Sequence, residues 1–222
     1  MNYNTLLLSI QSRIPHQYVL KTPTLVENTQ LIEDLIGQTF PQELIDFYSF
    51  SDGIEIEMRT SKNGKWNLGG QGIPPLATMF ADFKNVSADF DLDSCYEEPF
   101  YESIWTEDLL GNFNEEQQHF IRRQKIFLFI NGTSSNITID FLDEEKPYQL
   151  YFQPNGDLEF YPLQITVEQF YTIFLQIEVA GYWFAHFMTE ADREKAGFQK
   201  WNWKETLEVY PEFDLSTLEQ NK

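Results

Sequence analysis

The chain has 222 residues and carries 15 Lys and Arg against 35 Asp and Glu, a formal net charge of −20 with histidine neutral. Nucleic acid and anionic lipid repel so acidic a chain unless a basic stripe offsets the charge, and the densest basic pair in the middle is Arg122-Arg123. We therefore expect neither a nucleic-acid nor a membrane partner. Hydrophobic residues make up 42% of the chain, which excludes disorder over most of its length.

Cysteine usage and hydropathy predict a cytoplasmic protein. The single cysteine, Cys95, cannot form an internal disulfide or build a thiolate-rich zinc site with three dispersed histidines. No basic region precedes the short apolar run near the N-terminus, so a signal peptide is not expected. The most apolar stretch, residues 165–188, is interrupted by residues such as Glu168 and Glu178 and falls short of a membrane span.

The first 53 residues predict an N-terminal segment without a clear pattern, followed by a helix whose two ends are both marked in the sequence. Residues 1–38 are expected to be helical or irregular. In the next segment Thr39 and Gln42 fit a capping box, Pro41 fits the first turn, and Asp52-Gly53 is expected to end the helix. The expected core face of this helix carries Leu44, Phe47 and Tyr48.

A hairpin is predicted directly after this helix. Residues 54–60 alternate apolar and charged side chains, as a half-buried strand does. Asn63-Gly64 supplies a hairpin turn, and residues 66–68 are expected to form the returning strand. The segment GGQGIPP (69–75) is expected to be a flexible connection, because no Lys-Ser or Lys-Thr follows it to make a phosphate-binding loop.

The second half of the chain predicts an antiparallel meander and a helix. Turn-forming residues separate four short apolar strands, at 125–130, 136–142, 148–153 and 158–163. A helix over 166–188 is expected to pack on the sheet, followed by a polar helix from Thr189 and a docked segment, 198–213. This order predicts the α+β class: a mainly antiparallel sheet, made of a meander plus a hairpin, packed by N-terminal and C-terminal helices.

Between Lys84 and Arg122 the chain has ten acidic residues and no Lys or Arg, and aromatic residues are interleaved with the acids. The run from Asp89 to Asp93 fails as an EF-hand loop, because positions six and twelve are Ser94 and Phe100. The segment serves either solubility or the docking of a basic protein, and both readings stay open. The candidate partner-binding residues are Asp89, Asp91, Asp93, Glu97, Glu98, Tyr101, Glu102 and Trp105.

No catalytic or cofactor motif stands out. The chain has no Gly-X-Ser-X-Gly elbow, and Cys95 has no histidine nearby in sequence. His119 and His186 are flanked by apolar or aromatic residues, as structural histidines are. We expect no enzyme activity, no cofactor and no metal.

Several segments, in this order, resemble the SUKH superfamily. They are FPQELIDFYSFSDGI (40–54), GIPPL (72–76), KIFLFINGTSSNITIDFL (125–142), YQLYFQ (148–153) and the helix that starts at Thr166. The residues that match the family's structural signature are Pro41, Leu44, Phe47, Asp52, Gly53, Trp66, Pro74 and Asp140. The resemblance implies a single domain over 1–222, with a core at about 28–187, an acidic insertion at about 85–121 and a C-terminal extension at 189–222.

The resemblance also implies a function. Bacterial members of that superfamily are immunity proteins that bind and neutralise polymorphic toxins, often nucleases, and fungal relatives regulate cell-wall synthesis. We expect an immunity protein that occludes a cognate basic toxin in equal stoichiometry, with its acidic surface imitating the charge of nucleic acid. A non-catalytic regulatory scaffold or adaptor is the alternative, and a hydrolase without recognisable motifs is a third.

Overall fold

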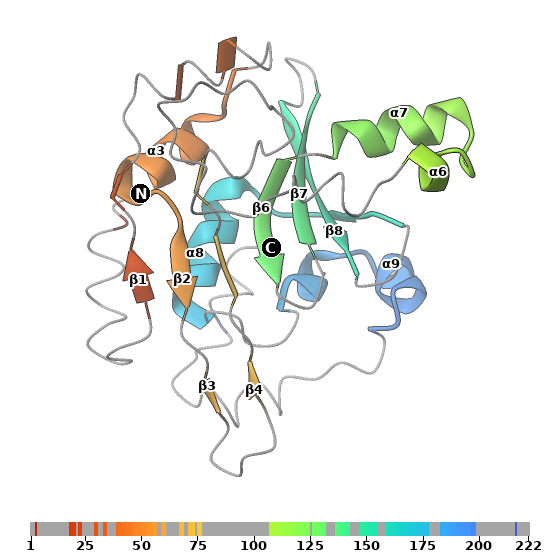
Figure 1. Ribbon diagram of the computed structural model, residues 1–222. Helices are drawn as coiled ribbons and strands as arrows, with labels where there is room; N and C mark the ends of the chain where they lie inside the picture. The colour runs from red at the N-terminus through yellow and green to blue at the C-terminus, as the bar shows by residue number, and fades with distance from the viewer. Residues whose placement is uncertain are drawn as a thin grey trace.

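The computed structural model describes residues 3, 18–20, 22–23, 29–30, 33–34, 39–56, 59–60, 67–68, 71–73, 75–76, 107–124, 126–131, 136–142, 147–154, 159–177, 183–198 and 216. These residues form an α+β fold around a seven-stranded sheet with the strand order β1-β2-β5-β6-β7-β8-β9 (Figure 1). Every paired neighbour in it is antiparallel. The predicted fold class is therefore confirmed.

The strands of this sheet are β1 (Tyr18–Leu20), β2 (Ile54–Ile56), β5 (Gln71–Ile73), β6 (Ile126–Asn131), β7 (Asn136–Phe141), β8 (Tyr148–Gln153) and β9 (Tyr161–Leu163). A separate antiparallel pair consists of β3 (Arg59–Thr60) and β4 (Asn67–Leu68). The helices are α3 (Gln42–Phe50), α6 (Glu107–Leu110), α7 (Glu115–Arg123), α8 (Val167–Ile177), α9 (Glu190–Lys195) and the 3₁₀ helix η2 (Trp183–Phe187). No helix in these ranges has the length and apolar character to cross a membrane.

The predicted meander is confirmed as β6 to β9, and its two faces differ in chemistry. Side chains alternate between the faces of a strand, and in β7 Ile137 and Ile139 are fully buried in the main apolar core. Their cross-strand partners in β8, Phe152 and Leu150, lie in the same core. The alternate residues of β7 are polar, so this part of the sheet has one apolar and one polar face.

Two helices and η2 cover the apolar face. Phe47 of α3 stacks on Tyr171 of α8 with ring centroids 3.8 Å apart and ring planes 13° apart. Phe184 of η2 lies 4.4 Å from Phe152 of β8, centroid to centroid. The predicted core face of α3 is confirmed, because Leu44, Phe47 and Tyr48 are all buried in the main core.

The predicted capping box at the start of α3 is wrong. The helix begins at Gln42 with Pro41 as its N-cap, and no side chain caps it. The predicted end is close but differs in detail, because the extended Ser51 is the C-cap and Gly53, with φ at 89°, turns the chain into β2. Asp52 Oδ1 accepts a hydrogen bond of 2.8 Å from the backbone N–H of Leu76, which holds that turn.

Three further predictions are corrected. Residues 69–75 are not only a connection, because Gln71–Ile73 forms β5 between β2 and β6, with Gly72 opposite both Glu55 and Ile130. Residues 1–38, expected to be helical or irregular, contribute the strand β1. The helix expected over 166–188 ends as α8 at Ile177, and η2 follows. The strands β5 and β1 form because they pair with strands distant in sequence, and their own residues carry no alternating strand pattern.

The polar helix expected after Thr189 is confirmed as α9, and the Thr189 side chain caps it by accepting from Asp192 N–H at 3.1 Å. The expected docking of the C-terminal segment is seen at Phe198, whose ring lies 5.6 Å from that of Phe152. The predicted hairpin turn at Asn63-Gly64 and residues 199–213 lie outside the described residues, although the β3–β4 pairing agrees with a hairpin there.

Candidate functional site

Helix α7 and its anchor on the sheet form the most distinctive polar arrangement in the described structure. The helix starts at a complete capping box, in which Asn114 Oδ1 accepts from Gln117 N–H at 2.9 Å and Gln117 Oε1 accepts from Asn114 N–H at 3.1 Å. Glu115 and Glu116 in its first turn interact favourably with the positive end of the helix dipole. The local sequence therefore fixes where this helix begins.

Apolar side chains on one side of α7 pack against α6, β8 and Phe160. Ile121 is buried against Leu110 of α6, and together they form a second, smaller core. Phe120 meets Tyr151 of β8 edge to face at 5.2 Å and Phe160 in the same manner at 5.6 Å. Figure 1 shows α7 beside β7 and β8, away from α3 and α8. The helix therefore packs on the polar face of the sheet.

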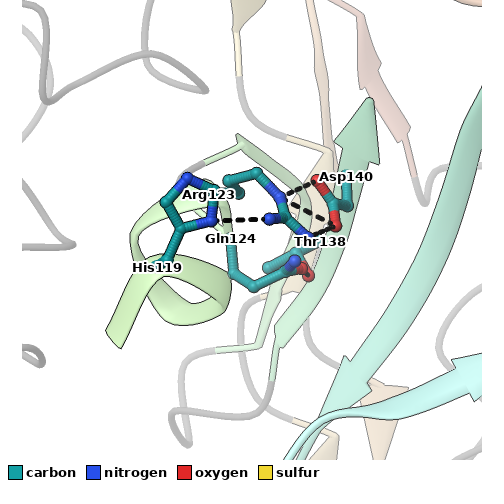
Figure 2. Close-up of polar contacts among 5 residues, drawn as sticks. All are labelled: His119, Arg123, Gln124, Thr138 and Asp140. Carbon is teal, nitrogen blue, oxygen red and sulfur yellow. Dashed lines mark hydrogen bonds and ion pairs between the residues drawn. The ribbon is translucent and has the colours of Figure 1, made fainter. Parts of the chain in front are cut away.

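An ion pair joins the C-terminal end of α7 to that face. Arg123 Nε lies 3.0 Å from Asp140 Oδ1, and Arg123 Nη2 lies 3.1 Å from Asp140 Oδ2 (Figure 2). The Asp140 side chain is only 1% exposed, whereas that of Arg123 is 42% exposed. Because a buried carboxylate needs a counter-charge, this bidentate contact compensates Asp140 near the C-terminal end of β7.

Two neighbours extend this contact into a polar network. Arg123 Nη1 lies 2.8 Å from His119 Nδ1, one helical turn earlier. A guanidinium can only donate, so His119 Nδ1 is the acceptor and carries no proton in this arrangement. On the inner side, Thr138 Oγ1 donates to Gln124 Oε1 at 2.7 Å, and both side chains are fully buried. His119, Arg123 and Asp140 therefore form a chain of polar contacts from the exposed surface of α7 to the buried face of β7, and the Gln124–Thr138 pair lies beside it in sequence on both elements.

The electrostatics of this network favour anchoring over proton transfer. The hydrogen bonds that Arg123 donates to Asp140 raise the pKa of Arg123 above its ordinary value and outweigh the opposing effect of burial. Burial raises the pKa of Tyr151, and the Asp140 carboxylate raises it further. Both oxygens of Asp140 are bound to the guanidinium, so this carboxylate is occupied as an acceptor. The arrangement ties the C-terminal end of α7 to β7.

The outward side of α7 is acidic at its N-terminal end. Glu115 and Glu116 are exposed, and so is Asp108 of α6 nearby in sequence. Within the described ranges no ion pair links these three carboxylates to a cation. No group of three or more His, Cys, Asp or Glu that could hold a metal ion occurs among those residues either. Asp108, Glu115 and Glu116 are therefore exposed to solvent, and no Lys or Arg among the described residues pairs with them.

The sequence-predicted site divides between described and undescribed residues. The eight candidate partner-binding residues lie outside the described ranges, as do Trp66 and Pro74; the eight are Asp89, Asp91, Asp93, Glu97, Glu98, Tyr101, Glu102 and Trp105. Of the other signature residues, Leu44 and Phe47 lie in the main core and Pro41 caps α3. Asp140 is the one signature residue that the structure brings into the polar network on α7.

Sequence reasoning missed α7 and the roles of His119, Arg123 and Gln124. The signal was present: Asn114 and Gln117 have the spacing of a capping box, and His119 and Arg123 are four residues apart on one helix face. The pairing of Arg123 with Asp140 crosses 17 residues and two elements, and no local pattern predicts it.

No protein-family model matches the sequence, and comparison with curated proteins and with solved structures gives no match either.

Proposed function

We propose that the chain acts in the cytoplasm as an immunity protein that binds a basic cognate toxin and neutralises it by stoichiometric occlusion. The observation that carries this proposal is the acidic N-terminal end of α7, where Glu115 and Glu116 are exposed and unpaired within the described residues. A fixed group of carboxylates attracts a cationic surface and pairs with its Lys and Arg side chains.

The anchoring of α7 supports this proposal. An interface loses less entropy on binding when its side chains are held on a rigid element. Here the capping box, the Ile121–Leu110 contact and the Arg123–Asp140 ion pair together restrain the helix. The net charge of −20 and the resemblance of residues 40–54 to the SUKH signature agree with the same function. The partner would then be a protein with a basic surface, such as a nuclease.

The experiment is capture of the tagged chain from lysate of its native host, with washes at moderate and high salt. The proposal predicts one basic partner, recovered in equal stoichiometry and released as the salt concentration rises. Expression of that partner alone should arrest growth of the host, and co-expression of this chain should restore it. Recovery of many substoichiometric partners, none of which arrests growth, contradicts immunity and favours the scaffold or adaptor.

A further inference from the structure

A groove with a volume of about 690 Å³ lies where α3 and α8 begin, beside the start of β8. Its apolar lining includes Phe40, Pro41, Pro147, Tyr148, Leu163 and Ile165. This volume is typical of sites that hold small organic ligands, and such sites combine an apolar lining with a few polar groups. The groove is on the apolar side of the sheet and is separate from the network of Arg123 and Asp140.

The walls of this groove are held in place without a ligand. Phe40 stacks on Phe141 of β7 with ring centroids 5.8 Å apart. The Tyr148 hydroxyl accepts a hydrogen bond of 3.1 Å from the backbone N–H of Val167, at the start of α8. Gln149 Nε2 donates to the carbonyl oxygen of Leu163 at 2.8 Å, which ties β8 to β9. A ligand therefore meets preformed walls, which limits the entropy lost on binding.

The charge of the groove is negative. Among the described residues that line it, Glu43 is the one ionised side chain, and no hydrogen bond or ion pair within the described structure occupies its carboxylate. Burial raises the pKa of Tyr148, and the nearby carboxylates of Glu43 and Glu168 also raise it. Both carboxylates therefore act on the hydroxyl that lines the groove.

The N-terminus of α8 does not reverse this charge, because its first donors are taken. Val167 N–H is bound to Tyr148, Thr166 N–H donates to Gln169 Oε1, and Gln169 N–H donates to Thr166 Oγ1. In both α3 and α8 a first-turn glutamate also offsets the helix dipole. An anionic ligand would meet Glu43 without a compensating cation among the described lining residues, whereas a cationic ligand would find its counter-charge there.

We propose that this groove binds a small organic amine, with its ammonium group on the Glu43 carboxylate and an aromatic or branched apolar body against Phe40, Tyr148 and Ile165. Carboxylates bind ammonium groups through charge-assisted hydrogen bonds, and the apolar walls remove the body of the ligand from water. The proposal concerns a different face from the acidic end of α7 and does not depend on the proposed immunity function.

The test is titration of the full chain with phenethylammonium, tryptamine and isopentylammonium, followed by NMR. The control ligand, 2-phenylethanol, has nearly the shape of phenethylammonium but no charge. The variant Glu43→Gln removes the carboxylate, and Glu194→Gln makes the same charge change at an exposed site on α9. Circular dichroism and thermal unfolding establish that both variants are folded.

The proposal predicts shifts at Leu163 and Ile165, an affinity for phenethylammonium about tenfold above that for 2-phenylethanol, and loss of this preference in Glu43→Gln alone. Failure of all three amines to bind at millimolar concentration overturns it, and so does equal affinity for amine and alcohol. The peptide acetyl-Leu-Lys-Leu-amide, if it binds here more tightly than the free amines, would instead assign the groove to a protein segment.

Discussion

Arg123 at the end of α7 binds both carboxylate oxygens of Asp140, near the C-terminal end of β7. The acid is almost fully buried and the base is half exposed. The guanidinium of Arg123 thus neutralises the buried carboxylate of Asp140 while remaining partly exposed to water. The same helix presents Glu115 and Glu116 to solvent, so the position of these acids depends on a contact made two turns away.

Loss of this ion pair should destabilise the fold. Arg123→Met leaves Asp140 buried without its counter-charge, and we expect the free energy of unfolding to fall by about 3 kcal/mol. Urea denaturation measures this change. The control is Lys195→Met, since the Lys195–Glu159 pair is exposed on both sides and should contribute about 1 kcal/mol or less. Equal effects of the two substitutions would contradict the anchoring role of Arg123.

The stack of Phe47 on Tyr171 should dominate the contact between α3 and α8. Phe47 is fully buried, so Phe47→Ala removes a ring from a packed core and should lower the free energy of unfolding by about 3–5 kcal/mol. Thermal and urea unfolding measure it. Leu142→Ala serves as the control, because Leu142 is 39% exposed and should cost about 0.5 kcal/mol or less. A small effect of Phe47→Ala would show that this core is wrongly assigned.

Buried tyrosines predict a loss of stability at alkaline pH. Burial raises the pKa of Tyr48 and of Tyr171 well above 10, whereas in the unfolded chain both titrate near 10. The unfolded state therefore releases these protons first. The contribution of the two tyrosines to stability is constant below about pH 9 and falls above pH 10, by up to about 1.4 kcal/mol per pH unit for each tyrosine.

The measurement is urea denaturation as a function of pH, together with phenolate absorbance. We expect part of the absorbance change of the eleven tyrosines to coincide with unfolding. Full ionisation near pH 10 in a chain that is still folded would contradict the burial of Tyr48 and Tyr171.

The assignment of Gln71–Ile73 as a central strand predicts slow hydrogen exchange. These residues lie between β2 and β6, and Ile73 is buried. The amides of β5 that pair with its neighbours should therefore exchange about as slowly as those of β7, because both open only with the sheet. Hydrogen exchange followed by mass spectrometry or NMR tests this. Rapid exchange at residues 71–73, alongside protection of β7, would contradict the strand β5 and support the flexible connection that the glycines predict.

These elements show what the sequence could and could not predict. The strands β7 and β8 could be predicted because apolar residues recur between turn-forming segments, and the core face of α3 because Leu44, Phe47 and Tyr48 have helical spacing. The strand β5 could not, since Gln-Gly-Ile has no strand pattern and extends only because β2 and β6 pair with it. The Arg123–Asp140 network depends on packing between distant elements.

The proposed function depends on acids at the surface of this chain that dock a basic toxin. The most direct measurement is the association rate of the captured partner with Glu115→Lys/Glu116→Lys, compared with the matched control Glu190→Lys/Glu194→Lys on the exposed surface of α9. A third variant reverses Asp91, Glu97 and Glu98 in the acidic segment.

We expect the α7 variant to associate at least about tenfold more slowly at low salt and with a weaker dependence on ionic strength, while the α9 control stays near the wild-type rate. An equal loss of association rate in the α7 and α9 variants would show that only the net charge of the chain matters. An unchanged rate in the α7 variant, and in the variant of the acidic segment, would remove these acids from the interface and contradict the claim.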